Sequence, residues 1–153
     1  MPAPVPETLS KARAYCARQE RCQQEVRDKL YGWGAYRSEV EPIIARLITE
    51  RYLDEKRFAE HFAVSKFRQK GWGRRKIQQA MQQKRVSAPC IRLGLQAIDA
   101  GEYRAMLAKL LNKQVQKLRT VPEPQRAMRA LRYLSGRGFE PDLVRAAMGR
   151  EED

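Results

Sequence analysis

The fold is decided by one stretch, residues 52–86, which reads YLDEKRFAEHFAVSKFRQKGWGRRKIQQAMQQKRV. It opens with a helix start, because Asp54 is a favoured N-cap residue and an acid follows it in the first turn. Apolar residues at helical spacing come next, until Gly71 and Gly73 interrupt them. A second amphipathic segment then runs through Ile77. The stretch therefore predicts two helices joined by a glycine turn.

The same helical period continues on both sides of this stretch, and no segment reads as a strand, so the chain is predicted to be all-α. In the second predicted helix, Val26, Leu30 and Trp33 share one apolar face. Ser38 and Glu41 have the spacing of a capping box, which predicts that Ser38 caps the third helix.

The helical pattern also repeats. A separation of 51 residues relates Val26 to Ile77 and Leu30 to Met81, and a further 53 residues lead to Ala130. Three-helix units cannot bury their apolar faces alone, so stacking predicts three tandem three-helix repeats in an elongated, curved chain. We assign a flexible leader to residues 1–6, repeats to 7–53, 54–100 and 101–149, and a tail to 150–153.

The composition is basic. The 153 residues are 42% hydrophobic and 32% charged, with a net charge of +13, which favours an acidic partner. No apolar run approaches the ~20 residues that span a bilayer, and the N-terminal residues lack the features of a secretory signal. Three cysteines without a C-x-x-C pair suit a reducing compartment. We therefore expect a cytoplasmic protein.

The positive charge is concentrated in the middle of the chain, where residues 61–98 hold nine basic residues and no acid. An ordinary solvated helix mixes both signs. Cations that follow phosphates, together with an aromatic ring that stacks on an unpaired base, are typical of a single-strand binding surface, although Trp72 fits a core or hinge position equally well. The candidate contact residues here are Lys66, Arg68, Lys70, Trp72, Arg74, Arg75 and Lys76.

A second basic stripe is formed by Arg126, Arg129 and Arg132, which are spaced three apart on a predicted helix. This spacing brings the three guanidinium groups to one side of the helix. Ordinary surface arginines would show the same pattern, so both interpretations stay open.

The sequence shows no catalytic or cofactor site. The glycine turn lacks the G-x-x-x-x-G-K-[ST] spacing of a phosphate loop. His61 is the single histidine and no thiols cluster, so we expect no metal. No serine or cysteine has a general base in evidence. We expect no cofactor and no enzymatic activity.

Two motifs resemble the signatures of the RecX family of bacterial recombinase regulators. The segment YLDEKRFA is similar to Y-L-D-[DE]-x-R-F-[AV], and GWGRRKI followed by KRV is similar to G-[YW]-G-x-x-[KR]-I followed by K-G-[IV]. Arg51 and Arg85 stand where the family has glycine, and Arg85 is expected either to accept a strained turn or to reshape it, at a cost of roughly 1 kcal/mol. The motif residues expected to be structural are Tyr52, Leu53, Asp54, Arg57, Phe58, Gly71, Gly73 and Ile77.

This resemblance implies three tandem three-helix repeats and a non-enzymatic modulator of the RecA recombinase. Members of the family are understood to bind RecA filaments on single-stranded DNA and to restrain strand exchange, ATP hydrolysis and co-protease activity. The implied partners are the RecA filament and single-stranded DNA, with duplex DNA as a further candidate and no membrane. A monomer is expected.

Two other functions were weighed. A stand-alone helix-turn-helix protein would need a polar recognition helix, and the predicted helix from Val40 to Leu53 is too apolar to be exposed in a groove. A nuclease would need clustered carboxylates for metal ions, which the basic segment lacks.

Overall fold

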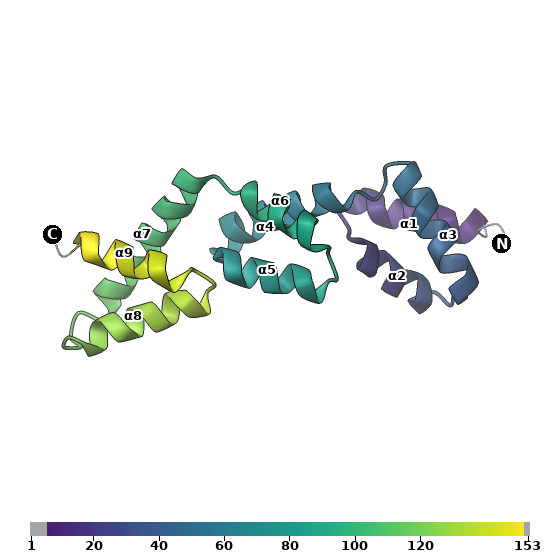
Figure 1. Cartoon of the computed structure of the whole chain (residues 1–153). Helices are drawn as coiled ribbons and strands as arrows, with labels where there is room; N and C mark the ends of the chain where they lie inside the picture. The colour runs from purple at the N-terminus through teal and green to yellow at the C-terminus, as the bar shows by residue number, and fades with distance from the viewer. Residues whose placement is uncertain (1–5, 152–153) are drawn as a thin grey trace. The chain divides into compact units, whose positions relative to one another are not determined.

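The computed structural model describes residues 6–151, and within that range it contains nine α-helices and no strand (Figure 1). The all-α prediction is confirmed. Apart from Pro6, the expected leader lies outside the described residues, as do the last two residues of the expected tail. The helices are α1 (Pro6–Arg18), α2 (Gln23–Gly32), α3 (Arg37–Thr49), α4 (Glu55–Lys70), α5 (Arg74–Gln83), α6 (Ala88–Gln96), α7 (Ala100–Lys117), α8 (Gln125–Gly136) and α9 (Pro141–Glu151).

Short polar side chains start several of these helices. Asp54 Oδ1 accepts the N–H of Arg57 at 3.0 Å ahead of α4, which confirms the predicted N-cap. Asp99 caps α7 in the same way, with Oδ2 accepting the N–H of Glu102 at 2.9 Å. These caps depend only on residues three positions apart, so they are visible in the sequence.

The capping box predicted at Ser38 and Glu41 is wrong. The N-cap of α3 is Tyr36, whose carbonyl accepts the N–H of Val40 at 3.2 Å. The carboxylate of Glu41 pairs instead with Arg27 of α2, at 2.7 Å. Because the Glu41 carboxylate is paired with Arg27, it does not form the hydrogen bond to the helix start that a capping box requires.

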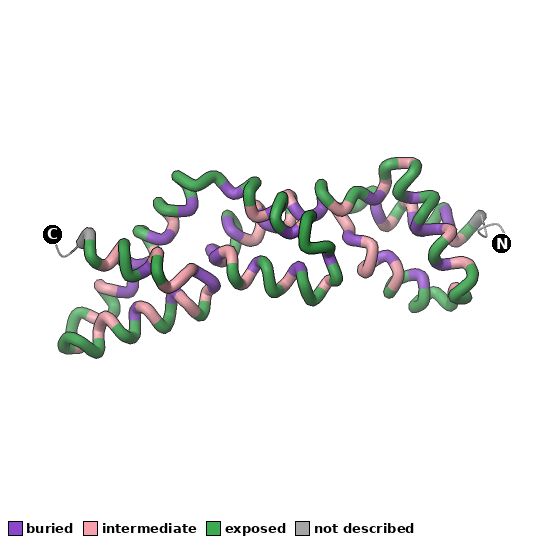
Figure 2. Tube along the Cα trace, in the orientation of Figure 1, coloured by how far each residue is buried: buried purple, intermediate pink, exposed green. Residues whose placement is uncertain are grey.

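The chain divides into two compact units. Unit 1 comprises the chain up to Phe62 together with Met81–Gly94, and unit 2 comprises Ala63–Ala80 together with the chain from Leu95 onward. The boundary therefore passes through α4, α5 and α6. Figure 2 shows buried and exposed positions alternating along each helix, as amphipathic helices require.

The core of unit 1 is formed mainly by α1, α2 and α3, with Leu30, Val40 and Leu47 completely buried. At its edge, Glu50 accepts hydrogen bonds from Arg13 at 2.6 Å and from Arg46 at 2.6 Å. These two guanidinium groups, with Arg13 contributing most, lower the pKa of the Glu50 carboxyl to about 2.

The core of unit 2 contains a row of three aromatic rings. The ring centroids of Phe67 and Tyr103 are 5.6 Å apart, and those of Tyr103 and Phe139 are 5.2 Å apart. Leu111 of α7 and Leu134 of α8 complete the apolar interior, where neither has any exposed surface. The row joins α4 and α7 to the residues that precede α9.

The same kind of contact joins two consecutive repeats in each unit, and we call it a joint. The start of the second helix of one repeat contacts a carbonyl that follows the second helix of the next repeat. In unit 1, Cys22 Sγ at the start of α2 lies 3.9 Å from the carbonyl oxygen of Lys84 after α5. In unit 2, the N–H of Gly73 at the start of α5 donates to the carbonyl of Arg137 after α8, at 2.8 Å. The 51-residue separation takes Cys22 to Gly73, and the 53-residue separation takes Lys84 to Arg137. The tandem repeat predicted from the sequence is therefore confirmed by equivalent contacts.

The turn that follows the second helix of each repeat has the same left-handed backbone. The equivalent residues Gly34, Arg85 and Gly138 have φ angles of 88°, 59° and 100°. The N–H of the next residue donates to the carbonyl five residues back, at 3.0 to 3.1 Å, which is the closure typical of a helix C-terminus. The strained turn expected at Arg85 is confirmed. Arg51, with a φ of 65°, adopts the same conformation after α3.

Candidate nucleic-acid interface

The glycine turn at residues 71–73 is held against residues 137–139 inside unit 2. A Cβ added to Gly73 would lie 2.3 Å from the carbonyl carbon of Gly138, so only glycine permits this approach. The guanidinium of Arg137 donates to the carbonyl of Gly71 at 3.3 Å and to that of Lys70. Both motif glycines therefore lie in the joint between the second and third repeats.

Trp72 is half-buried between two lysines. The Nζ atoms of Lys66 and Lys76 lie 5.2 and 4.7 Å from the centroid of its ring. Ammonium groups at this distance are attracted by the negative face of an indole. The tryptophan is therefore neither a core residue nor a fully exposed one, and it gathers two of the candidate cations.

Two arginines of the basic segment are paired with carboxylates from the third repeat. Arg68 donates to both carboxylate oxygens of Glu102, at 3.2 and 3.0 Å. Arg74 lies 2.8 Å from Glu140. The hydrogen bonds that Arg68 donates to Glu102 raise the pKa of Arg68. The middle segment has no acid of its own, but the fold supplies two from elsewhere in the chain.

Arg74 belongs to a partly buried network around Tyr103. Its guanidinium lies 3.8 Å from the centroid of the Tyr103 ring, and its backbone N–H donates to the Tyr103 hydroxyl at 3.0 Å. That hydroxyl donates in turn to Glu140. Burial, reinforced by the Glu140 hydrogen bond, raises the pKa of Tyr103 above its ordinary value. The position of Arg74 is thus explained by packing of the joint.

Of the remaining cations, Lys66 and Lys76 are half-buried beside Trp72, and the other two face solvent. Lys70 and Arg75 are exposed, and neither makes an ion pair with another residue in the described part of the chain. In the sequence they flank Trp72, and both lie between Lys66 and Lys76. The predicted basic block thus reduces to an outward-facing set around one aromatic ring: Lys66, Lys70, Trp72, Arg75 and Lys76.

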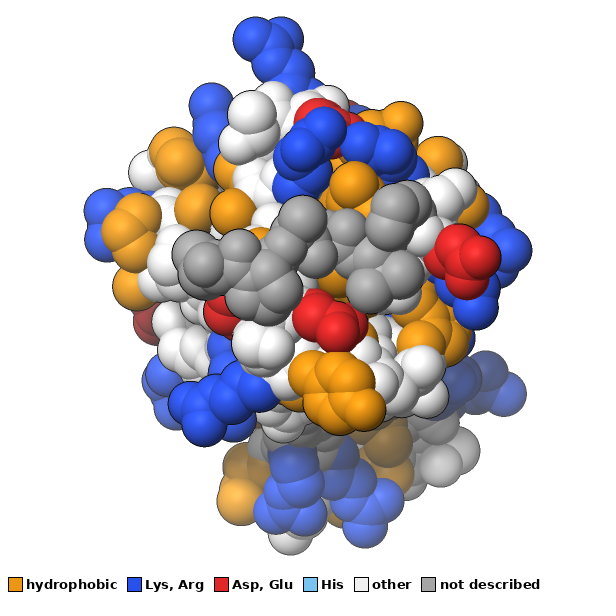
Figure 3. Space-filling model, turned by 90° about the vertical axis from the view of Figure 1, so that its right-hand side faces the viewer, with side chains coloured by type: hydrophobic (Ala, Val, Ile, Leu, Met, Phe, Trp, Pro, Cys, Tyr) orange, Lys and Arg blue, Asp and Glu red, His pale blue; other side chains and the backbone are white. Residues whose placement is uncertain are grey.

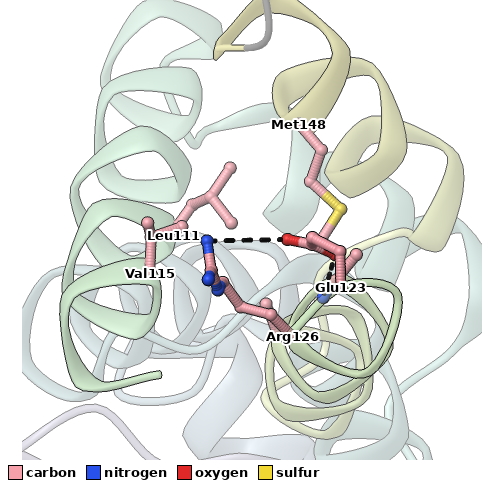
Figure 4. Close-up of a pocket in the computed structure, with 7 residues that line it drawn as sticks. Leu111, Val115, Glu123, Arg126 and Met148 are labelled. Atoms are coloured by element: carbon pink, nitrogen blue, oxygen red, sulfur yellow. Dashed lines mark hydrogen bonds and ion pairs between the residues drawn. The ribbon is translucent and has the colours of Figure 1, made fainter. Parts of the chain in front are cut away.

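The second predicted stripe is divided in the same way. Arg126 turns back onto the loop before α8, where its Nε donates to the carbonyl of Val121 at 2.9 Å. It lines a cavity of about 230 Å³ opposite Glu123, with an N–O distance of 3.8 Å (Figure 4). Arg129 and Arg132 are exposed on α8. Of the three arginines of this stripe, Arg129 and Arg132 are therefore exposed and Arg126 is half-buried.

Sequence reasoning missed the structural part played by Arg137. Its side chain holds the carbonyls of Lys70 and Gly71, and it also lies 5.8 Å from the Tyr133 ring. A signal was available, because the segment Arg137-Gly138-Phe139 stands at the repeat separation from Lys84-Arg85-Val86.

The described residues contain no group of three His, Cys, Asp or Glu side chains placed to hold a metal ion. None of the described helices is long and apolar enough to cross a membrane.

Family models cover most of the chain in three successive parts. The RecX first three-helix domain matches residues 9–47, the second matches 54–95 and the third matches 102–148. Each match overlaps three of the helices described above.

Several regulatory proteins are similar in sequence over nearly their whole length. The chain is 30% identical to regulatory protein RecX of Acinetobacter baylyi, over 94% of this chain and 87% of that protein. It is 31% identical to regulatory protein RecX of Halorhodospira halophila, over 90% and 83%. The identity to the same-named protein of Mycobacterium sp. strain KMS is 28%, over 94% and 82%.

Two crystal structures share the fold. RecX from Lactobacillus salivarius superimposes with a TM-score of 0.84 at 18% identity, over 95% of this chain and 97% of that one. A second structure, of a regulatory protein RecX, gives a TM-score of 0.82 at 21% identity, over 93% and 72%.

Proposed function

Because the chain belongs to the RecX family, we propose that it is a regulator that binds RecA filaments on single-stranded DNA. In this role it inhibits strand exchange, ATP hydrolysis and co-protease activity of RecA. The observation that carries the proposal is the succession of three RecX domain matches along the chain.

The outward-facing set around Trp72 supports a contact with the filament. Lys70 and Arg75 have no carboxylate partner among the described side chains, so binding a phosphate would not require breaking an ion pair. Phosphate contacts of this kind supply most of the non-specific affinity for nucleic acid. We assign this set, with Arg129 and Arg132, to the surface that meets DNA or the acidic surface of the recombinase.

The proposed regulator acts by binding alone, as a monomer, with no cofactor and no metal. Its target places it in the cytoplasm. Duplex DNA is a second ligand of the same cations, since phosphates are common to both forms.

Titration of this protein into a single-stranded-DNA-dependent ATPase assay of RecA tests the proposal. Wild-type protein at substoichiometric amounts is expected to inhibit ATP hydrolysis. The double variant Lys70→Glu/Arg75→Glu is expected to relieve that inhibition. Arg74 is left intact, because it packs on Tyr103 and its loss would disturb the joint.

The matched control is Lys113→Glu/Arg145→Glu, which changes the net charge equally at two exposed residues without ion pairs in the described structure. The control is expected to inhibit like wild type. Equal loss in both double variants would show a general charge effect and contradict the assigned surface. Absence of inhibition by wild type at any ratio would contradict the function itself.

A further inference from the structure

Three acidic residues of the first repeat form ion pairs with arginines. Glu50 pairs with Arg13, Glu41 with Arg27, and Glu20 with Arg57, at 2.6, 2.7 and 2.6 Å. Residues 1–60 hold 11 basic and 10 acidic residues, so the sequence alone gives no reason to expect a basic surface here. Several other cations of this repeat make no ion pair in the described part of the chain.

Three of those cations gather on an aromatic pair. Tyr15 and Trp33 meet edge to face, with ring centroids 6.2 Å apart. Lys29 Nζ lies 5.5 Å from the Tyr15 ring and 5.9 Å from the Trp33 ring, and Lys11 Nζ lies 5.8 Å from the Trp33 ring. The guanidinium of Arg21 lies 3.9 Å from the Tyr15 ring. We call these five residues the N-terminal aromatic cluster.

Trp33 lies on the surface. It is 37% exposed, whereas Val26 and Leu30, which share its helical face in the sequence, are 1% and 0% exposed. The turn that begins at Trp33 also presents Tyr36, which is 74% exposed. On the side of the molecule that Figure 3 shows, Lys and Arg side chains lie next to hydrophobic ones at several places.

The residues equivalent to Trp33 in the other two repeats make contacts between repeats. The repeat separations relate Trp33 to Lys84 and Arg137. Lys84 pairs with Glu25 at 3.5 Å, and Arg137 binds the carbonyl of Gly71, so both fasten one repeat to another. Trp33 instead contacts Tyr15 of the adjacent helix in its own repeat. An exposed indole here is therefore not part of a joint.

We propose that the N-terminal aromatic cluster is a binding site for unpaired nucleotides of single-stranded DNA. A base stacks on the indole of Trp33, and the ammonium groups of Lys11 and Lys29 move from the ring to the adjacent phosphates. Stacking of this kind accepts every base, because every base has a π-face. The site rests on the proposed function, in which single-stranded DNA is part of the target.

The chemistry of the cluster favours an unpaired strand over other anions. An acidic peptide would use the cations but would leave the exposed aromatic rings without a partner. Duplex DNA would offer phosphates, but its bases are already stacked on one another. An unpaired strand satisfies both parts of the cluster at once.

The chain has two tryptophans, and this allows each proposed surface to be observed separately. In Trp72→Phe the fluorescence reports on Trp33, and in Trp33→Phe it reports on Trp72. We expect oligo(dT) of about 20 nucleotides to quench the Trp33 signal saturably, with quenching reversed by salt, as phosphate contacts require. Trp33→Ala is expected to weaken oligo(dT) binding by roughly 5- to 150-fold, the range of one lost stacking contact.

The lysines are tested in the Trp72→Phe background. Lys11→Glu/Lys29→Glu is expected to abolish quenching of Trp33, whereas Lys113→Glu/Arg145→Glu is expected to preserve it. If oligo(dT) leaves the Trp33 signal unchanged, the site is refuted, whatever happens to Trp72. A Trp33 signal that responds to RecA and not to oligo(dT) would refute it in favour of a protein contact.

The RecA ATPase assay separates this inference from the proposed function. Inhibition of RecA without quenching of Trp33 would remove the site and leave the function standing. Quenching of Trp33 without inhibition of RecA would keep the site and remove the function.

Discussion

Arg51 and Arg85 hold a left-handed backbone that an L side chain disfavours, because its Cβ crowds the following carbonyl. Arginine has no intrinsic preference for this left-handed conformation. The conformation is imposed by the helix ends, where the next N–H must reach a carbonyl five residues back, as it does from Tyr52 to Leu47 at 2.9 Å. The closing hydrogen bonds and the packing of the turn outweigh the local strain.

Arg85→Gly is expected to stabilise the protein by up to about 1 kcal/mol, since relief of the strain exceeds the entropy that glycine loses on folding. Arg51→Gly is expected to act in the same direction. Urea unfolding measures both effects as a higher midpoint. A lower midpoint in either variant would mean that the arginine side chain contributes more than its backbone costs.

Gly73→Ala is expected to destabilise the protein by roughly 3 kcal/mol or more, because the new Cβ would overlap the backbone of Gly138, which cannot give way as a flexible side chain could. The control is Gly136→Ala, where nothing lies within 4 Å of the added Cβ. That change falls at the end of α8 and is expected to be neutral or slightly stabilising. Equal unfolding midpoints for the two variants would contradict the close approach.

Residue-scale features were predictable from the sequence when their partners are near in the chain. The cap at Asp54 was predicted correctly because its acceptor and donor are three residues apart. The box at Ser38 failed because Arg27, 14 residues from Glu41, competes for the carboxylate. Trp33 fits the period of an apolar face and still lies on the surface, because α2 ends at Gly32.

At the scale of elements, Tyr103 links three parts of unit 2. Its ring packs between Phe67 of α4 and Phe139 ahead of α9, and its hydroxyl lies between the start of α5 and Glu140. A hydroxyl that both donates and accepts in a buried place is costly to remove, because its partners are left unsatisfied.

Tyr103→Phe is expected to lower the free energy of unfolding at neutral pH by roughly 1–3 kcal/mol. It is also expected to flatten the loss of stability above about pH 10. The folded-state pKa of Tyr103 is raised, so the unfolded chain loses this proton first as the pH rises, and wild type loses stability that the variant does not have.

Urea unfolding at several pH values between about 8 and 11 measures this difference. Tyr36→Phe removes an exposed hydroxyl and is the control for stability at neutral pH. Parallel curves for wild type and Tyr103→Phe would contradict the role of the buried hydroxyl.

The candidate site was only partly predictable at this scale. Charge density drew attention to Arg74 and Arg75 equally, since they are adjacent and chemically identical. Their different surroundings come from Glu140, which lies 66 residues away from Arg74 in the chain. No local pattern separates a cation that packs a joint from one that faces solvent.

On the scale of the whole molecule, the net charge of +13 overstates what is available to a ligand. Arg13, Arg27, Arg57 and Arg68 are each bonded to a glutamate. The cations that remain available to a ligand are concentrated where the sequence has no acids or where the acids are already in ion pairs. Salt dependence therefore reports on a small number of phosphate contacts and not on the net charge.

Lys70→Gln/Arg75→Gln is expected to reduce the slope of log K against log salt for single-stranded DNA by roughly 1.4, at about 0.7 for each lost phosphate contact. The control Lys113→Gln/Arg145→Gln removes the same charge and is expected to keep the wild-type slope. Binding to oligo(dT) between about 50 and 200 mM salt measures both. An unchanged slope in the first variant would mean that neither cation meets a phosphate.

Arg126 bears on how a protein of this architecture could grow by gene duplication. The repeat separations place it at the position that Cys22 and Gly73 occupy in the first two repeats. In those repeats, the residue at this position contacts a backbone carbonyl of the following repeat. In the third repeat, Arg126 carries a long side chain bonded to the carbonyls of Val121 and Arg119. A duplicated copy of the third repeat would meet the guanidinium of Arg126. At the equivalent positions the second repeat contacts the thiol of Cys22, and the third contacts the backbone N–H of Gly73. A further module docked at this position would therefore have to displace the arginine side chain or meet a smaller residue in its place.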